Sequence, residues 1–413
     1  MSLRICHFAI EGANDAVAQF QTMENGETEM LVKEIQAAVG EVLNEMVQDR
    51  AFASYQGHYS TQLKEQLAYT LSSANCALFS SGSSAMEAVL RASGVGPGDK
   101  VLLSGYDYPG NFWAIERCGA TPVLLDTEPQ SWNLDASKLE AALGKLEADV
   151  SGQVAAKALI VSHLHGQLQD VAGLKAILCD RSIALIEDSC QAIGAQIPSP
   201  TNSLKPMPVG ESSDALVVSF GGGKVLSAGR GGALLTRSDA LAQKAKLAAG
   251  AGSGPYAMSE LQAATVLAQL PFLKCIDATA RQFFTEVQDE IRSFSHFSPS
   301  QPLIESPVDL SARESQTSIY QMGWIRQSKE SALNEVEPSP IPGFKVEQDG
   351  FSGGSGFSGF HRRSKRRCLT PIPLQQVPLL ARDTIVVHHG VALEGRTSPQ
   401  EVAESIFAIL KRN

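Results

Sequence analysis

The sequence predicts an α/β fold, with a mainly parallel seven-stranded sheet and a smaller α+β domain at the C-terminus. Seven short apolar runs lie between residues 76 and 236 with helical segments among them. This alternation is typical of a parallel sheet that is covered by helices on both faces. After Ser293 the pattern changes and prolines recur. The length of 413 residues is enough for one large domain and a smaller one.

Two helices are expected ahead of the sheet. Residues 26–50 carry apolar side chains at helical spacing, from Met30 to Leu43, and residues 59–72 have the pattern of a second helix. We assign residues 1–54 to an N-terminal helical segment.

The predicted large domain covers residues 55–292. Its expected strands are CALFS (76–80), KVLLS (100–104), TPVLLD (121–126), KALIVSH (157–163), SIALIED (182–188), DALVVSF (214–220) and GGALLT (231–236). Its expected helices cover residues 83–91, 111–118 and 136–146, and a nearly continuous helical stretch follows over 259–291.

The predicted C-terminal domain covers residues 293–413. Residues 319–327 (IYQMGWIRQ) and 383–393 (DTIVVHHGVAL) have the pattern of strands, and residues 398–411 that of a closing helix. Between them, residues 348–367 are rich in glycine and serine and then basic, with the glycines concentrated at 349–360. This composition predicts a surface loop outside the core.

The composition favours a cytoplasmic enzyme. The formal net charge of -10 opposes non-specific binding to nucleic acid or anionic membranes. Seven cysteines without a CxxC pair suit free thiols in a reducing compartment and argue against a zinc or redox motif. The N-terminus lacks the pattern of a secretory signal, and no stretch approaches the ~18 apolar residues of a membrane span.

Polar clusters are expected at the carboxyl ends of successive strands, where open α/β sheets build their sites. Residues 80–84 (SSGSS) precede a helix, so their hydroxyl and N–H groups could cradle a phosphate; a plain serine N-cap is the alternative. Residues 105–109 (GYDYP) place an aromatic side chain where it could stack on a flat cofactor ring, or they form a turn around a packed tyrosine.

Two further clusters contain an acid and a lysine. Asp188 ends a strand; opposite a pyridine nitrogen it would keep that nitrogen protonated, and a helix N-cap is the alternative. Lys224 follows a strand in Ser219–Lys224 (SFGGGK), ahead of a glycine turn. A lysine in a dry pocket loses its proton more easily and becomes a nucleophile toward carbonyls; a solvated lysine after a turn is the alternative. Together the four clusters supply the groups that a pyridoxal-phosphate (PLP) enzyme needs.

Sequence motifs for other cofactors and for metals are less well supported. The GGGKV segment is not a P-loop, because Val218 stands where the first glycine is required and Val225 where a hydroxyl is required. No GxGxxG follows the first strand, so a dinucleotide-binding fold is unsupported. His163 and His165 would lie on one side of a strand, but no third metal ligand is suggested. The adjacent residues of the 388–389 histidine pair should face opposite ways in a strand, and we expect no metal site.

The sequence resembles the DegT/DnrJ/EryC1/StrS family of PLP-dependent aminotransferases, known mostly for amino-sugar and aminocyclitol synthesis. The resemblance runs from Tyr55 to Gln282 and rests on several motifs in order: the 80–126 segment, HLHGQLQDVAGLKAI, IEDSCQAIGA, SFGGGKVLSAGRGGALLT and MSELQAATVLAQL. The later VVHHGVALEG is similar to the subgroup of aminohydroxybenzoate synthases and inosose aminotransferases.

The resemblance implies a type I, aspartate-aminotransferase-like fold and a homodimer with sites at the subunit interface. It implies that Lys224 holds PLP as a Schiff base and shuttles protons, and that Asp188 pairs with the pyridine nitrogen. Gln191 would lie beside the ring oxygen and Tyr108 would stack on the ring. The implied cofactor-binding residues are Gly82, Ser83, Ser84, Tyr108, Asp188, Gln191, Ser219 and Lys224.

The chain departs from the family pattern in several places. Pro255 and Ala257 replace an asparagine and an arginine of GxNxRM, which puts a cross-subunit phosphate contact in doubt. Arg230 stands where an acid is common. An insertion around 198–208 and the glycine-rich 349–360 segment are also unusual.

These features predict transfer of an amino group from glutamate or glutamine to a keto sugar or keto cyclitol through Lys224. A PLP-dependent lyase or dehydratase acting on a sugar-like substrate is the alternative enzyme. A PLP-fold protein that serves as a binding or regulatory partner is the alternative from another class.

Overall fold

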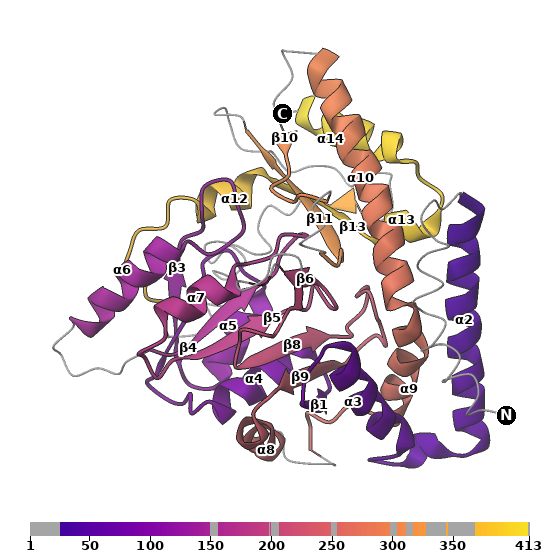
Figure 1. Cartoon of the computed structure of the whole chain (residues 1–413), viewed down its shortest axis with the longest axis horizontal. Helices are drawn as coiled ribbons and strands as arrows, with labels where there is room; N and C mark the ends of the chain where they lie inside the picture. The colour runs from indigo at the N-terminus through magenta and orange to yellow at the C-terminus, as the bar shows by residue number, and fades with distance from the viewer. Residues whose placement is uncertain are drawn as a thin grey trace.

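A seven-stranded sheet lies at the centre of the structure, and helices cover both of its faces (Figure 1). The structure is a computed structural model that describes residues 25–148, 156–197, 199, 206–248, 254–297, 304–310, 317–327, 344–345 and 368–411. The strand order is β1-β9-β8-β5-β4-β2-β3. The strands are β1 (Asn75–Phe79), β2 (Lys100–Ser104), β3 (Thr121–Leu125), β4 (Ala156–Ser162), β5 (Ala184–Asp188), β8 (Ala215–Ser219) and β9 (Gly232–Thr236).

The pairing of these strands confirms the predicted mainly parallel sheet. Strands β3, β2, β4, β5 and β8 are parallel neighbours, and β9 is antiparallel to both of its neighbours, β8 and the edge strand β1. Ser162 at the end of β4 is opposite Asp188 at the end of β5. The register therefore brings the carboxyl ends of β4, β5 and β8 to one edge of the sheet.

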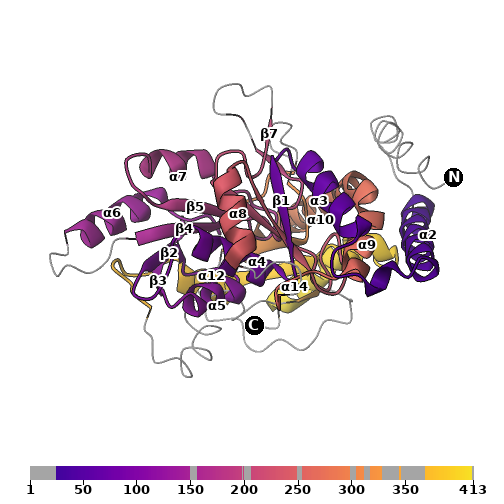
Figure 2. The same cartoon turned by 90° about the horizontal axis from the view of Figure 1, so that it is seen from below.

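Both faces of the sheet are buried, which explains the continuous apolar runs in the sequence. On β5, Ile186 packs with α4 (Gly82–Ala92) and α5 (Pro109–Arg117), whereas Leu185 packs with α6 (Ala136–Glu147) and α7 (Val171–Ile177). Strands β2 and β4 alternate in the same way. Figure 2 shows α6 and α7 on one side of the sheet and α4 and α5 on the other. Because alternate residues are buried on opposite faces, no polar face remains.

Two helices from the start of the described chain pack beside this sheet. Helix α2 (Asn25–Gln48) lies along α9 (Glu260–Gln269), and α3 (His58–Thr70) packs on α9 and β1; the short helix η1 (Ala51–Ala53) joins them (Figure 1). The helical stretch expected over 259–291 is divided. It comprises α9, the 3₁₀ turn η2 (Leu270–Phe272) and α10 (Leu273–Phe297), because Pro271 cannot donate a helical hydrogen bond.

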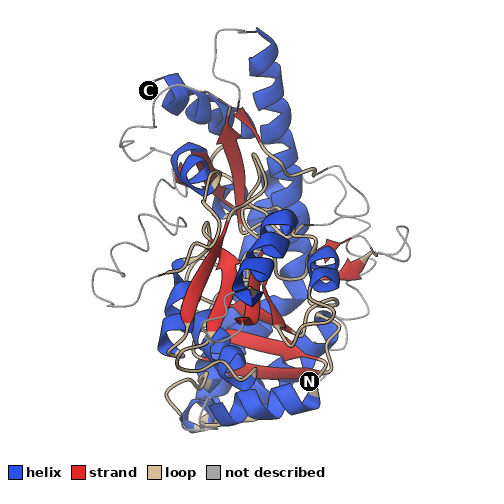
Figure 3. Cartoon of the chain, turned by 90° about the vertical axis from the view of Figure 1, so that its left-hand side faces the viewer, coloured by secondary structure: helices blue, strands red, loops and turns tan. Residues whose placement is uncertain are grey.

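A second, four-stranded antiparallel sheet occupies the C-terminal part of the chain (Figure 3). Its order is β10-β11-β13-β12, and its apolar core includes the second half of α10 and the last helix. The elements are β10 (Ile304–Glu305), β11 (Gln321–Arg326), β12 (Phe344–Lys345), α12 (Val377–Asp383), β13 (Thr384–His388), α13 (Gly390–Glu394) and α14 (Pro399–Lys411). Arg326 at the end of β11 and Asp383 at the end of α12 form a buried ion pair at 2.9 Å.

Two buried contacts connect this sheet to the large one. The Asp126 carboxylate at the end of β3 accepts the N–H groups of Gln375, Gln376 and Val377 at 2.7–3.0 Å, and so caps the start of α12. The indole N–H of Trp132 donates to Thr384 at 3.1 Å. These contacts fix the position of the C-terminal strands relative to the carboxyl edge of the large sheet.

Some expectations for individual elements were wrong or incomplete. The strand expected over 383–393 ends at His388, and α13 follows, because the β-branched run stops there and Val391 to Glu394 are compatible with a helix. The sequence analysis missed α7 and α8 (Asp239–Ala248), and also β6 (Gln196–Ile197) and β7 (Met207–Pro208), which flank the insertion as a short ribbon. The 349–360 segment and the basic run after it lie outside the described residues.

Among the helices that the structure describes, none combines the length and apolar character needed to cross a membrane.

Candidate active site

Lys224 lies in a tight turn just beyond the carboxyl end of β8. Its N–H donates to the carbonyl of Gly221 at 3.1 Å, and Gly223 before it has φ +78°, a conformation that glycine adopts without strain. The side chain is half-buried. Burial lowers the pKa of the Lys224 amine, and the carboxylate of Asp188 opposes this shift. The lysine follows a glycine turn, as the alternative expects, but its side chain is only partly exposed.

Asp188 lies nearby at the end of β5, and its side chain is 5% exposed. One oxygen, Oδ1, accepts the N–H of Cys190 at 2.9 Å, and Oδ2 accepts the side-chain amide of Asn111 at 2.8 Å. Both oxygens accept hydrogen bonds, so the orientation of this buried carboxylate is fixed. Such a group suits an electrostatic partner for a cationic ring nitrogen.

A second buried carboxyl, Asp107, lies beside Asp188 and was not singled out from the sequence. Its Oδ1 accepts the Ser162 hydroxyl at 2.7 Å, the Tyr108 N–H at 2.6 Å and the Asn111 amide at 3.1 Å. Its Oδ2 is buried and has no hydrogen-bond partner among the described residues. Burial, together with the negative charge of Asp188, raises the pKa of Asp107 to about 7. Asn111 thus bridges two acids at the edge of the sheet.

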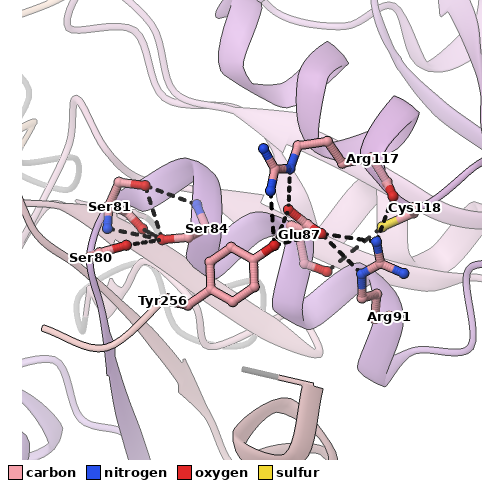
Figure 4. Close-up of polar contacts among 8 residues, drawn as sticks. All are labelled: Ser80, Ser81, Ser84, Glu87, Arg91, Arg117, Cys118 and Tyr256. Carbon is pink, nitrogen blue, oxygen red and sulfur yellow. Dashed lines mark hydrogen bonds and ion pairs between the residues drawn. The ribbon is translucent and has the colours of Figure 1, made fainter. Parts of the chain in front are cut away.

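The N-terminus of α4 forms the third part of the site (Figure 4). Ser81 is the N-cap: its hydroxyl accepts the Ser84 N–H at 3.1 Å, and the Ser84 hydroxyl accepts the Ser81 N–H at 2.9 Å. The Ser80 hydroxyl lies 3.3 Å from that of Ser84. The N-cap interpretation of this cluster is confirmed, and the hydroxyl of Ser84 takes part in it.

Gly82 brings the start of α4 against two other segments of the site. A Cβ at this position would lie 3.0 Å from the Cβ of Ser219 and 3.1 Å from the sulfur of Cys190. Ser83 is next on the helix, and a Cβ at Gly110 would lie 2.5 Å from its hydroxyl. A helix N-terminus, a strand-end serine and a glycine that permits close approach therefore meet in one place, as in sites that bind phosphate groups.

The remaining predicted residues lie around this centre. Tyr108 is the N-cap residue of α5 and is 45% exposed, so its ring borders the site without being enclosed in the core. The side-chain oxygen of Gln191 accepts the N–H of His165 at 3.0 Å, which fixes this amide behind Asp188. Arg230 is exposed.

A buried carboxylate supports α4 and α5 from beneath the site (Figure 4). Glu87 accepts hydrogen bonds from Arg117 at 2.6 Å, from Arg91 at 2.9 Å and from the hydroxyl of Tyr256 at 3.2 Å. The carbonyl of Tyr256 also accepts the Ser80 N–H at 2.7 Å. The segment that contains Pro255 is thereby tied to the N-terminus of α4, although it departs from the family pattern.

The side chains of His163 and His165 contact polar groups of the protein. His163 donates from Nε2 to Glu187 at 2.7 Å and accepts the Gln169 N–H at Nδ1. Burial lowers the pKa of His165 to about 3, and its ring contacts the Tyr106 hydroxyl at 3.1 Å. Within the described ranges, no group of three or more His, Cys, Asp or Glu side chains could hold a metal ion.

The expectation that the rings of His388 and His389 face opposite ways was wrong. Their centroids are 4.3 Å apart. The alternation of a strand ends at His388, and His389 has the helical conformation φ -58°, ψ -24° as the N-cap of α13. Both rings turn toward Tyr320.

A family model, described as the DegT/DnrJ/EryC1/StrS aminotransferase family, matches residues 30–322. The chain belongs to this family. It is 31% identical to GDP-perosamine synthase from Caulobacter vibrioides over an alignment of 234 residues. This alignment covers 54% of this chain and 59% of the synthase. It is 32% identical over 195 residues to L-glutamine:scyllo-inosose aminotransferase from Streptomyces griseus, covering 47% and 42% of the two chains. The chain thus spans about three-fifths or less of the length of these two curated relatives.

The solved structure of NtdA from Bacillus subtilis, with bound cofactor PMP, shares the fold at a TM-score of 0.66 and 19% identity, covering 92% of this chain and 82% of that one. This likeness confirms the fold that the resemblance implied, namely that of PLP-dependent aminotransferases.

The residues of the site fit pyridoxal phosphate. A Cβ at Gly82 would lie tightly against Ser219 and Cys190, so the glycine allows backbone N–H groups to approach a phosphate closely. Asp188 is a buried, fully hydrogen-bonded carboxylate, and the pKa of Lys224 is lowered toward the range of a nucleophilic amine. At this edge of the sheet, the N-terminus of α4 suits a phosphate, Asp188 suits a protonated ring nitrogen, and Lys224 suits an aldehyde.

Proposed function

We propose that the protein is a PLP-dependent aminotransferase that moves an amino group from glutamate or glutamine to a keto sugar or keto cyclitol. The observation that supports this most is the meeting of Lys224, Asp188 and the N-terminus of α4 at one sheet edge, in a chain of this aminotransferase family. Two relatives are named for such reactions, one a GDP-perosamine synthase and one an L-glutamine:scyllo-inosose aminotransferase.

In this proposal each residue has a physical task. When bound, the cofactor supplies an aldehyde for amines and an electron sink for proton transfer at the substrate carbon. Asp188 stabilises positive charge on the ring nitrogen, because both of its oxygens are held and it is shielded from water. Lys224 would hold the cofactor through its aldehyde and, when its amine is free, would carry a proton from the substrate carbon to the cofactor carbon, since burial favours its neutral form.

The groups around them bind and orient the cofactor. Gly82, Ser83, Ser84 and Ser219 hold its phosphate, with the hydroxyl of Ser84 acting mainly through the helix cap that it stabilises. Tyr108 would stack on the cofactor ring, and Gln191 would lie beside the oxygen substituent of the ring.

We further propose a homodimer with shared sites and a cytoplasmic location, as the family resemblance and the free cysteines indicate. The proposed division into residues 1–54, 55–292 and 293–413 assigns cofactor binding to the middle part. The C-terminal part would then contribute to the choice of acceptor.

The experiment begins with the visible absorbance of purified protein after addition of PLP. Glutamate or glutamine should bleach this absorbance, and ¹⁵N from the donor should appear in a keto sugar or inosose from a panel. Lys224→Ala should abolish both effects, whereas Lys244→Ala, at an exposed lysine of α8, should change neither.

Other outcomes would identify the alternatives. Elimination of water from the sugar without ¹⁵N transfer would indicate a lyase or dehydratase. Cofactor binding with neither reaction would indicate a binding or regulatory protein. An active Lys224→Ala variant would contradict the mechanism.

A further inference from the structure

Three rings of the C-terminal sheet gather beside Lys224. The Nζ atom of Lys224 lies 3.9 Å from the centre of the Tyr320 ring, close enough for a cation–π interaction. His388 meets the same ring edge-on, with the centroids 4.9 Å apart at 85°. The ring of His389 is 5.9 Å from that of Tyr320. The environment of the lysine is therefore completed by a part of the chain distant in sequence.

His388 also holds the backbone next to the lysine. Its Nδ1 accepts the N–H of Gly390 at 3.0 Å, so in the neutral ring the proton is on Nε2. This Nε2–H donates to the carbonyl of Gly223 at 2.8 Å. A Cβ at Gly223 would lie 3.3 Å from the same nitrogen, so the glycine permits this close approach. One imidazole thereby joins the residue before Lys224 to the end of β13.

The position of Tyr320 is fixed by its neighbours. Its carbonyl accepts two hydrogen bonds from His389, from the N–H at 3.0 Å and from Nδ1 at 3.1 Å. Two residues earlier, the Ser318 hydroxyl donates to Asp277 of α10 at 2.8 Å. Burial lowers the pKa of His389 to about 3, so its ring is neutral and does not repel the ammonium of Lys224. The tyrosine is thus held from both sides.

We propose that Tyr320 and His388 are positioning residues for Lys224: the Tyr320 ring stabilises its ammonium form and His388 fixes the turn that carries it. The C-terminal sheet thereby controls the proton affinity and the place of the amine. The catalytic role of these two residues rests on the proposed function. Their contacts with Lys224 and its turn do not depend on it.

The first test measures the amine directly and requires no cofactor. The full-length protein, before addition of PLP, is acylated with acetic anhydride over a range of pH, and labelling of Lys224 is compared by mass spectrometry with that of exposed Lys244. Tyr320→Leu removes the ring. We expect the labelling midpoint of Lys224 to move to lower pH, with labelling near neutral pH rising up to about tenfold. Tyr320→Phe keeps the ring and should leave the midpoint unchanged.

These variants separate electrostatic stabilisation from simple opening of the pocket. If Tyr320→Leu raised the maximum labelling rate of Lys224 without moving its midpoint, the ring would only shield the amine and the proposal would be wrong. An unchanged curve would refute it as well. Labelling of Lys244 in the same sample shows that the reagent is active, and the urea-unfolding curve of each variant shows whether it is folded.

The second test addresses His388. His388→Phe keeps a ring but removes the donor to Gly223, whereas His388→Gln keeps an N–H group. We expect faster amide hydrogen exchange in residues 221–226 of His388→Phe, and about a tenfold loss of kcat with little change in the donor KM. His388→Gln should restore much of both. Unchanged exchange and kcat in His388→Phe would refute this role.

The proposal and the proposed function can fail separately. If no PLP binds and no transamination occurs, the labelling and exchange experiments still decide whether Tyr320 and His388 act on Lys224. If transamination occurs but labelling and exchange are unaffected, the enzyme assignment stands and the positioning role is wrong.

Discussion

The pair of buried acids at the sheet edge leads to a prediction about pH and stability. Asp107 is 1% exposed, and its Oδ2 has no hydrogen-bond partner among the residues described. Asp107→Asn keeps an oxygen that can accept from Ser162, Tyr108 and Asn111 but removes the charge that faces Asp188. We expect the variant to gain stability relative to the wild type as the pH rises.

The size of the effect follows from the pKa of Asp107, which is about 7 in the folded protein against an ordinary value of 3.8. Below about pH 4 the acid is protonated in both states and the free energy of unfolding is unaffected. As the pH rises, the unfolded chain releases its proton first, so the folded state loses up to about 4 kcal/mol by about pH 8. About 2–3 kcal/mol of this loss falls between about pH 5 and pH 8. The new amide adds a cost of about 1–3 kcal/mol that does not depend on pH.

The assay is urea unfolding of the ligand-free protein at several pH values between 5 and 8. The difference in unfolding free energy between Asp107→Asn and wild type should increase with pH by about 2–3 kcal/mol. Asp180→Asn, at an exposed aspartate, should follow the wild-type curve at a constant offset. Parallel curves for Asp107→Asn would show that Asp107 is ionised throughout this range and would refute the reasoning.

Three further predictions concern the helices and the cysteines. Glu87→Gln should lower the unfolding free energy by about 2 kcal/mol, because two guanidinium groups lose a buried carboxylate partner, and the midpoint of urea unfolding measures this. Gly82→Ala should weaken PLP binding at least tenfold in a fluorescence titration, because its Cβ would lie 3.0 Å from Ser219; wild-type affinity would refute the close approach. Iodoacetamide should label exposed Cys179 well before Cys76, whose burial raises its thiol pKa to about 12; equal labelling in a mass-spectrometric time course would contradict this.

The strands of the large sheet could be predicted from the sequence because of how they are buried. Each parallel strand is covered on both faces, so runs such as Val101 to Leu103 are apolar without interruption. The strand ends were equally visible, since Asp188, Ser219 and the residues near them mark where the apolar runs in the sequence stop. The cofactor roles of these residues stay predictions until they are tested.

The rest of the site could not be predicted because it depends on tertiary contacts. Asp107 and Asn111 lie four residues apart at the start of α5, a spacing that could have drawn attention to them, but Asp188 and Ser162 reach them only through sheet register. Tyr320 approaches Lys224 only because a second sheet lies on the first. No local pattern contains that information.

The edge strand β1 has a consequence for how the protein is made. Its sheet neighbour is β9, which enters the chain about 150 residues later, immediately after the Lys224 turn. During synthesis, therefore, β1 is without this neighbour while the ribosome adds all the intervening strands. An unpaired apolar strand favours association with other chains, so this interval is the one in which the growing polypeptide is most open to association through β1. The pairing of β9 with β1 ends this interval, and it follows directly on the synthesis of the turn that contains Lys224.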